Sequence, residues 1–315
     1  MGPTGAASVL ELTPADLSVV IPTRRRWETL QVTLAALEAQ TEQGFETIVV
    51  ADGTDQQVPE LTGVRIVQQD HAGPGAARNR GVEESERRLI LFLGDDMIPG
   101  PELVARHLAR HRADPAEEAA VLGRVVWHPS VPRDRIHRWL DWSCALFDYR
   151  QLESEGDGDV GWTRFYSSNV SLKRDLFLAA GGFDPDFTFD YEDLDFGWRL
   201  GNHGMRLAYE PAALAEHLHA YDWAAVRRRY ESRAAAERLM QAKHDWFEPW
   251  FHGQMEAAMR ERPASRLWTL AVDRVPPRAR FLRREFEKRA DRHYLQRLAP
   301  AFLATWAATS TPEHQ

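Results

Sequence analysis

Cysteine, long apolar runs and a basic leader are scarce or missing in this 315-residue chain, and each absence narrows what the protein can be. The single cysteine, Cys144, excludes an internal disulfide and fits a reducing compartment, and we expect it to be a small buried side chain. No run approaches the ~18 apolar residues of a membrane span, and residues 1–16 lack the pattern of a secretory signal. We therefore expect a cytoplasmic protein.

An excess of positive charge is missing as well, because the formal net charge is -8, which argues against general nucleic-acid binding. This charge is unevenly distributed. Residues 221–298 contain 18 Lys and Arg against 11 Asp and Glu, a net of +7, whereas the remainder contains 21 against 36, a net of −15. We predict separate modules: a flexible segment 1–16, an α/β domain over 17–220 and a helical region over 221–315.

Apolar strand patterns alternate with helical patterns through the first third of the chain. Expected strands cover residues 17–22, 45–51, 64–67 and 89–93. The segment after the first strand has the helical spacing Leu30, Leu34, Leu37. This alternation predicts an α/β fold with a largely parallel sheet flanked by helices. The polar residues that follow each strand should then gather along one edge of the sheet, where such sheets bind ligands.

Acidic residues follow two of these strands. Gly94-Asp95-Asp96 ends the buried strand 89–93, and Asp52 ends the strand 45–51. Adjacent carboxylates repel each other, so a bound cation would explain Asp95 and Asp96. A solvated turn is the alternative for that pair, and a turn or helix cap is the alternative for Asp52.

A basic run and a second acidic pair are further candidates. Arg24–Arg26 fit contact with a phosphate or other ligand, or else a solvated turn. Glu192-Asp193 lies near apolar residues that could alter a carboxylate pKa, which suits a general base. The alternative is a helix N-terminus enriched in acids. Gly73-Pro74-Gly75 is a weak dinucleotide signal, because it follows the third strand and lacks the full glycine fingerprint.

The order of these motifs resembles a known family. Val19-Val-Ile-Pro-Thr-Arg24, Val49-Val-Ala-Asp-Gly-Thr-Asp55, Gly73–Gly81 and Leu91-Phe-Leu-Gly-Asp-Asp96 are followed by Ser168–Arg174, Gly181-Gly-Phe-Asp184 and Tyr191–Leu200. In this order and spacing the chain is similar to family 2 glycosyltransferases of the GT-A fold over roughly residues 17–220. The resemblance implies a metal-dependent, inverting transfer of a sugar from a nucleotide-sugar, in polysaccharide biosynthesis or on a smaller acceptor.

The resemblance also implies site residues. It places Mn²⁺ or Mg²⁺ on Asp96 and His217, with His219 as the competitor of His217. Gly94 departs from the family's usual first Asp, which leaves ribose contacts there in doubt. The expected nucleotide-sugar contacts are Pro22, Thr23, Arg24, Asp52, Gly75, Arg78 and Asp95.

The same resemblance makes Asp193 the general base, with Glu192 orienting the acceptor. We expect Asn169, Trp162 and Trp198 at the acceptor. UDP is the default donor nucleotide because it is common in the family, and the acceptor is a saccharide, a lipid-linked sugar or a small molecule.

Two segments leave alternatives open. The aromatic residues of segment 128–167 suit stacking on an acceptor sugar or packing on the core, and residues 153–159 have the composition of a loop. After residue 220 several helices are expected. Their arginines and aromatic residues fit peripheral contact with anionic lipid at the inner face of a membrane, packing on the α/β domain, or a homodimer interface.

Two other functions compete with glycosyl transfer. A degenerate, non-catalytic binding or scaffold protein would explain Gly94. A sugar-phosphate nucleotidylyltransferase would normally have a glycine-rich loop after the first strand, where Pro22-Thr23-Arg24 offers no glycine.

Overall fold

The computed structural model describes residues 12–55, 57–143, 145–155, 158–276 and 278–309. The expectations for Cys144 and for residues 1–11 fall outside these ranges. The strands are β1 (Leu17–Thr23), β2 (Glu46–Asp52), β3 (Arg65–Gln69), β4 (Leu89–Leu93), β5 (Met97–Pro99), β6 (Ala119–Trp127), β7 (Asn169–Lys173) and β8 (Arg206–His217).

The helices surround these strands and continue beyond them. They are α1 (Trp27–Glu38), α2 (Pro74–Glu83), α3 (Leu103–Ala113), α4 (Arg135–Trp142), α5 (Tyr149–Glu155), α6 (Arg174–Ala179), α7 (Glu192–Asn202), α8 (Trp223–Lys243), α9 (Trp250–Arg260), α10 (Leu267–Ala271) and α11 (Arg280–Ala308). Short 3-10 helices are η1 (Pro14–Asp16), η2 (Trp162–Arg164) and η3 (Val272–Arg274).

One sheet with the order β3-β2-β1-β4-β7-β6-β8-β5 organises the first 217 residues. The pairs β3–β2, β2–β1, β1–β4 and β6–β8 are parallel, whereas β7 is antiparallel to both neighbours and β5 is antiparallel to β8. The mostly parallel sheet predicted from the strand–helix alternation is confirmed. The antiparallel strands were not foreseen.

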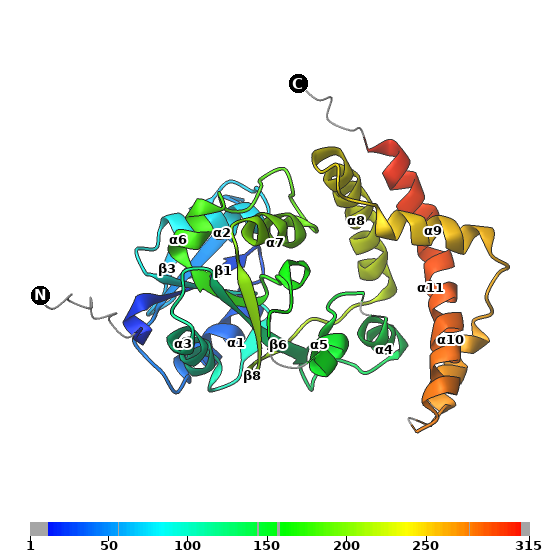
Figure 1. Cartoon of the computed structure of the whole chain (residues 1–315), viewed down its shortest axis with the longest axis horizontal. Helices are drawn as coiled ribbons and strands as arrows, with labels where there is room; N and C mark the ends of the chain where they lie inside the picture. The colour runs from blue at the N-terminus through cyan, green and yellow to red at the C-terminus, as the bar shows by residue number, and fades with distance from the viewer. Residues whose placement is uncertain (1–11, 56, 144, 156–157, 277, 310–315) are drawn as a thin grey trace, which may run out of the picture.

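Helices cover both faces of this sheet. Figure 1 shows α1 and α3 on one side and α2, α6 and α7 on the other. Strand β4 lies between them with all five side chains fully buried, which explains its continuous run of Leu, Ile and Phe. The carboxyl ends of β1, β2 and β4 therefore meet at one edge, where Thr23, Asp52 and Asp95 follow.

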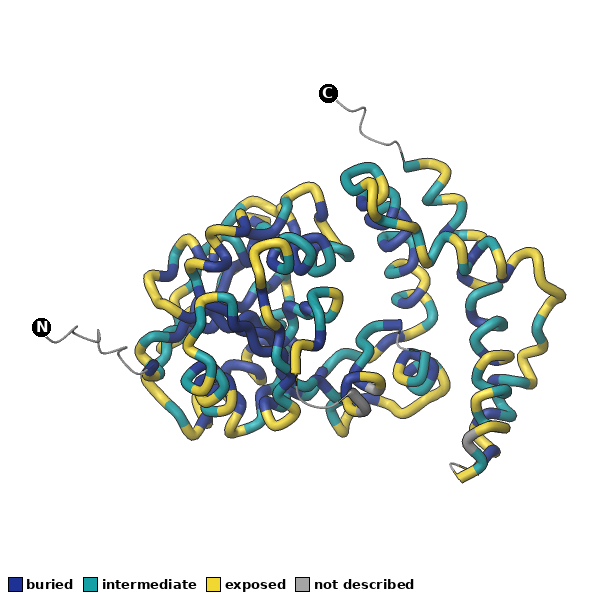
Figure 2. Tube along the Cα trace, in the orientation of Figure 1, coloured by how far each residue is buried: buried dark blue, intermediate teal, exposed yellow. Residues whose placement is uncertain are grey.

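The helices after residue 220 form a second apolar cluster (Figures 1 and 2). Helix α4 packs into it from the segment between β6 and β7. The Trp139 ring stacks on Tyr294 of α11 with 4.6 Å between centroids, and its Nε1 donates a hydrogen bond of 2.9 Å to Asp291. Part of the aromatic content of segment 128–167 therefore serves packing.

Three local features differ from expectation or add to it. Residues 149–155 form α5, so the first three residues of the loop expected at 153–159 are helical. Strand β5 was missed, because a three-residue strand ending in proline leaves no periodic signal. Among the described helices, none combines the length and apolarity needed to cross a bilayer.

Candidate functional site

The centre of the site is the turn after β4. Asp95 and Asp96 are both buried there, and Met97 begins β5. Because Met97 pairs with His217 at the end of β8, and the Leu218 N–H donates to the Asp96 carbonyl at 2.8 Å, two distant segments meet at this turn. The sheet thus brings a histidine to an acid 121 residues earlier in the chain.

Asp96, His217 and His219 form a cluster whose ligand atoms all lie within 4.8 Å of one another. His217 Nε2 is 3.2 Å, and His219 Nδ1 3.6 Å, from Asp96 Oδ2. Burial alone would raise the pKa of Asp96, but His217 and Arg26 hold it well below its ordinary value. Burial lowers the pKa of His219 to about 4, so its imidazole is neutral at pH 7 and keeps a lone pair.

This donor set fits a divalent cation. One ionised carboxylate and two imidazoles lie within the span of a single coordination sphere, and imidazole suits transition ions better than Mg²⁺, which prefers oxygen. Trp127, the neighbour of His217 across β6 and β8, stacks on its ring at 5.2 Å and 13° and fixes its orientation. The expected Mn²⁺ or Mg²⁺ stays a prediction.

Arg26 is the counter-charge of both acids. Its guanidinium lies 3.1 Å from Asp95 Oδ1 and 2.6 Å from Asp96 Oδ2, and one of its nitrogens is 3.5 Å from His219 Nδ1. Arg26 therefore touches the same Asp96 oxygen as the histidines. A cation bound there and the guanidinium would have to share or exchange this position.

Asp95 faces the end of β1. It accepts a hydrogen bond of 2.8 Å from the buried Thr23 hydroxyl. Burial, and then the charge of Asp96, raise the pKa of Asp95 to about 6. Pro22 is partly buried beside Thr23, and Arg24 lies 3.9 Å from Asp55 at the surface. Of the three nucleotide contacts predicted in this segment, Thr23 contacts the acidic turn, whereas Arg24 faces Asp55.

Asp52 holds the glycine-rich turn before α2. Its two oxygens accept hydrogen bonds from the N–H groups of Ala72 and Gly73 and from the side chains of Gln69 and His71. Burial opposes the charge on Asp52, but these four bonds outweigh it and lower its pKa. Gly73 has φ 94°, and a Cβ there would lie 2.4 Å from the Thr188 carbonyl oxygen, so only glycine fits. The expected nucleotide contact of Asp52 stays a prediction.

The Glu192-Asp193 pair begins α7. Burial, and then Asp193, raise the pKa of Glu192 to about 7, and burial also raises that of Asp193. Asp193 Oδ2 accepts a hydrogen bond of 3.0 Å from the Ser167 N–H, whereas Oδ1 has no hydrogen-bond partner among the described residues. Arg78, expected at the nucleotide, is buried with its guanidinium 3.5 Å from Glu192. Gly75 lets α2 approach closely, since a Cβ there would lie 3.1 Å from the Cβ of Phe183.

Helix α8 holds the backbone just before this acidic pair. Asp190 and Tyr191 have φ of 66° and 67°, a region unfavourable for Tyr. Arg233 lies 3.4 Å from Asp190, and the Tyr191 hydroxyl donates to Glu237 at 2.8 Å. Glu237 is fully buried and also accepts bonds from two N–H groups at the start of α9, those of Phe251 and His252. The C-terminal helices thus stabilise the turn that presents Glu192 and Asp193.

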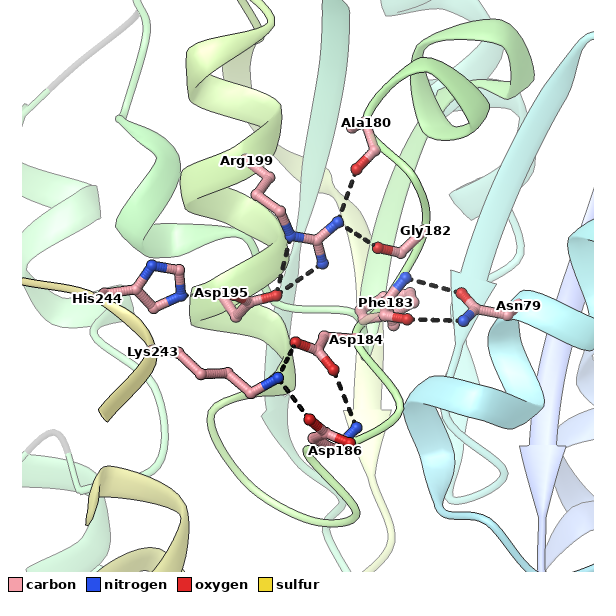
Figure 3. Close-up of polar contacts among 10 residues, drawn as sticks. All are labelled: Asn79, Ala180, Gly182, Phe183, Asp184, Asp186, Asp195, Arg199, Lys243 and His244. Atoms are coloured by element: carbon pink, nitrogen blue, oxygen red, sulfur yellow. Dashed lines mark hydrogen bonds and ion pairs between the residues drawn. The ribbon is translucent and has the colours of Figure 1, made fainter. Parts of the chain in front are cut away.

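The loop preceding that turn is fastened from both sides (Figure 3). Asn79 of α2 exchanges two hydrogen bonds with the backbone of Phe183, at 2.7 and 2.8 Å. Arg199 bonds Asp195 on its own helix and the carbonyls of Ala180 and Gly182. The α8 terminus contributes a further clamp, in which Lys243 bonds Asp184 and Asp186, and His244 bonds Asp195 at 2.8 Å.

Asn169, expected at the acceptor, is surrounded by other residues of the protein. It is fully buried, its amide donates to the carbonyls of Ala213 and Arg124, and its oxygen lies 3.0 Å from His107 Nε2. A chain of polar contacts continues through His107, Ser171, His111 and Lys173 at 2.8 Å each. Because every polar side-chain atom of Asn169 is used inside the protein, the residue has a structural role at the bulge of β6, and its expected contact with an acceptor stays a prediction.

Trp162 and Trp198 lie together on a partly exposed aromatic face. Trp198 stacks on Trp246 at 5.4 Å, and Trp162 meets the same ring edge-on at 5.4 Å. Trp198 points away from the N-terminus of α7, since it contacts His244 after α8. Their contact with an acceptor stays a prediction.

Several site residues were missed from the sequence. Arg26 ends the noted arginine run, but nothing distinguished it from Arg24 and Arg25. His71 carried no signal. Asp190, Arg233 and Glu237 meet only through the packing of α8, and no local pattern links residues so far apart.

Comparison with known proteins places these features in a family context. Residues 18–170 match the model of "Glycosyl transferase family 2". The chain is 30% identical over 226 residues to validoxylamine A glucosyltransferase of Streptomyces hygroscopicus subsp. jinggangensis, covering 60% of this chain and 52% of that protein. It is 29% identical over 235 residues to pre-mycofactocin glycosyltransferase of Mycobacterium tuberculosis, covering 70% and 47%. The chain thus spans about half the length of these curated relatives.

Among solved structures, the chain resembles mannosyltransferase PcManGT from Pyrobaculum calidifontis, solved in complex with GDP-Man and Mn²⁺. The TM-score is 0.50 at 15% identity, with 94% of this chain and 75% of the other covered. At this identity the likeness concerns the fold, and it confirms the expected GT-A architecture.

Proposed function

Because residues 18–170 of this chain belong to glycosyl transferase family 2, we propose that the protein is a metal-dependent, inverting glycosyltransferase that moves a sugar from a nucleotide-sugar to an acceptor hydroxyl. The observation that carries the proposal is the Asp96–His217–His219 cluster at the end of β4, with the acidic pair of α7 presented from the neighbouring helix. The two groups match the two charges that such a transfer develops.

The first charge is on the leaving group. A divalent ion held by Asp96, His217 and His219 would supply positive charge to the departing diphosphate. Arg26 is the second positive group at this place and is free to pair with phosphate oxygens when an ion neutralises Asp96. The mannosyltransferase of similar fold was solved with GDP-Man and Mn²⁺, which supports a metal-dependent transfer.

The second charge develops at the acceptor hydroxyl, which loses its proton during the transfer. In the transfer, the acceptor hydroxyl oxygen bonds to the anomeric carbon as the bond from that carbon to the diphosphate breaks. The bonding electron pair leaves on the nucleoside diphosphate, and the proton passes to Asp193. We assign that proton to Asp193 Oδ1, a buried oxygen without a hydrogen-bond partner among the described groups, which supports but does not by itself establish the role.

Several finer expectations stay predictions. No contact of the described residues distinguishes UDP from GDP or dTDP, and peripheral membrane contact and a homodimer are likewise untested. One observation bears on the helical region: Arg229, for which contact with lipid and pairing with the acidic surface of the α/β domain were the alternatives, lies 3.5 Å from Asp190. This pairing supports packing of α8 on the α/β domain.

The proposal is tested by Asp193→Asn. With a panel of nucleotide-sugars and Mn²⁺, release of nucleoside diphosphate and transfer to simple sugars are measured for wild type and variant. We expect the variant to lose transfer by at least a thousandfold while nucleotide binding stays within twofold, because only the base is removed. Undiminished turnover would exclude Asp193 as the base.

The second candidate, a non-catalytic binding subunit, rests on Arg26. A guanidinium that permanently neutralised Asp95 and Asp96 would leave no charge for an ion. In that case nucleotides would bind without metal dependence and no donor in the panel would be consumed.

A further inference from the structure

A cavity of about 280 Å³ lies directly beside the Asp96 cluster. It is enclosed by the end of β6, by α4 and by the chain that enters α5, and His217 forms part of its wall. Trp127 and Phe147 also line the cavity, and their rings lie against the His217 ring with 5.2 and 6.4 Å between centroids. The cavity is therefore continuous with the proposed metal site, yet it lies on the β6–β8 side, away from the β1 and β2 ends.

The lining combines apolar rings with charged groups. Trp127, Phe147 and Leu140 supply flat or aliphatic surface. Arg124, Arg133, Asp141 and Glu153 supply two positive and two negative groups. Arg124 and Glu153 are paired at 2.6 Å, whereas Arg133 and Asp141 are exposed and have no ion-pair partner among the described residues.

This combination selects a class of ligand. A purely apolar ligand would strip water from four charged groups without replacing their hydrogen bonds. A phosphate or carboxylate would meet two acids as well as two arginines. A hydroxylated ring satisfies both parts, since its C–H face packs on aromatic rings and its hydroxyls bond to charged side chains. The volume is near the lower end of ligand pockets, which suits one ring.

The cavity is also connected to the proposed base. Phe147 and Tyr149 pack on Tyr166 at 5.3 and 5.8 Å, and the next residue, Ser167, donates to Asp193. Burial raises the pKa of Tyr149, and the Asp193 charge contributes to that rise, as expected for neighbours. An acceptor needs its hydroxyl near the base and its ring outside the space that the donor occupies. The cavity borders Asp96 through His217, and its wall is linked to Asp193 through Tyr166 and Ser167.

We propose that this cavity binds the terminal ring of the acceptor, and that this ring is a neutral, hydroxylated saccharide or cyclitol. The identification of this ring as the acceptor rests on the proposed function, but binding of the ring does not depend on the donor. It places acceptor recognition on β6, α4 and α5 and not on the Trp162–Trp198 face.

Direct binding tests the proposal without nucleotide or metal. Saturation-transfer NMR is recorded with methyl glucoside, methyl mannoside and myo-inositol as neutral rings, and with glucuronate and glucosamine as charged ones. At least one neutral ring should bind in the millimolar range and more tightly than the charged rings. Phe147→Ala should weaken it at least tenfold, whereas Phe281→Ala, at an exposed position on α11, should have no effect.

Two further variants make the outcome decisive. Asp141→Ala changes only an exposed rim group, so it keeps the fold and should weaken binding a few-fold even if Phe147→Ala does not fold. Loss of binding in Trp198→Ala, with binding retained in Phe147→Ala, would overturn the proposal in favour of the other face. Failure of every neutral ring to bind wild type would also overturn it, while metal-dependent nucleotide binding would still support the proposed function.

Discussion

The surroundings of two acidic pairs in this molecule shift the pKa values of their carboxylates, in opposite directions for Asp95 and Asp96 and in the same direction for Glu192 and Asp193. Asp95 has a pKa raised to about 6 by burial and by Asp96, whereas the pKa of Asp96 is held low by His217 and Arg26. Glu192 has a pKa raised to about 7 by burial and by Asp193. Neighbouring carboxylates with separated pKa values are typical of sites in which one acid stays charged and the other exchanges protons. Asp96 suits a permanent ligand, and the α7 pair suits a base.

The pH dependence of transfer should report the α7 pair. Because burial raises the pKa of Asp193 as well as that of Glu192, the base should take up its proton at a higher pH than an ordinary aspartate, so kcat/KM should fall tenfold per pH unit on the acid side. Glu192→Gln removes a buried negative neighbour of Asp193 and should move this acid limb to lower pH. A rate profile that is flat from pH 5 to 8 in wild type would contradict this assignment.

At the scale of elements, α8 belongs to the site although it follows the matched family segment. Two consecutive residues, Asp190 and Tyr191, adopt left-handed backbone conformations that cost of order 1–3 kcal/mol each. Arg233 and Glu237 of α8 offset that cost with a buried ion pair and a hydrogen bond. The helical region is thereby a positioning element for the turn that presents the base.

Arg233→Met should loosen this turn. Removing the charge leaves the buried Asp190 with Arg229 as its remaining cation, so kcat should fall at least tenfold with nucleotide affinity unchanged. Hydrogen exchange over residues 186–194 should accelerate in the same variant. Arg228→Met, at an exposed position on the same helix, is the matched control and should resemble wild type.

The polar chain between α3 and β7 should make the fold sensitive to acid. The Lys173 ammonium donates to His111 Nδ1, and the Asn169 oxygen accepts from His107 Nε2. His107 Nδ1 therefore accepts from the Ser171 hydroxyl, and both histidines are neutral. Burial lowers the pKa of His107 to about 4, whereas in the unfolded chain it is near 6.5. The contribution of neutral His107 to the free energy of unfolding is therefore complete above pH 6.5. It falls by about 3 kcal/mol as the pH drops from 6.5 toward 4.

Urea unfolding of wild type and His107→Gln between pH 7 and 4 measures this difference. The variant should be less stable at pH 7, and the two stabilities should converge toward pH 4. Parallel curves would show that His107 does not carry the acid sensitivity.

At the scale of the whole molecule, much of the architecture could be predicted from local patterns. Strand β4 was evident because a strand buried on both faces must be apolar throughout, and Asp95 and Asp96 were evident because they end it. The helices after residue 220 followed from their spacing. The antiparallel placement of β7 and β5 could not be predicted, since strand direction is set by long-range pairing that leaves no periodic trace.

Less of the site could be predicted from the sequence, for a similar reason. Asn169 is a polar residue in a motif that suggested the acceptor, yet its partners His107 and Ala213 lie on other elements and bury it. The Arg233–Asp190 pair joins α8 to the turn before α7, and either residue alone resembles an ordinary surface charge. Local sequence shows which residues end a strand, but tertiary packing decides which of them remain available to a ligand.

The account depends most directly on Asp96 as a metal ligand at a nucleotide site. Thermal stability of wild type and Asp96→Ala is measured with UDP, dTDP, GDP and CMP, each with and without Mn²⁺. A ligand that binds only the native state raises the melting temperature by mass action. We expect at least one nucleotide to stabilise wild type only when Mn²⁺ is present. The same nucleotide should not stabilise Asp96→Ala, either with or without Mn²⁺. Stabilisation that is equal with and without Mn²⁺, or equal in the variant, would contradict the account.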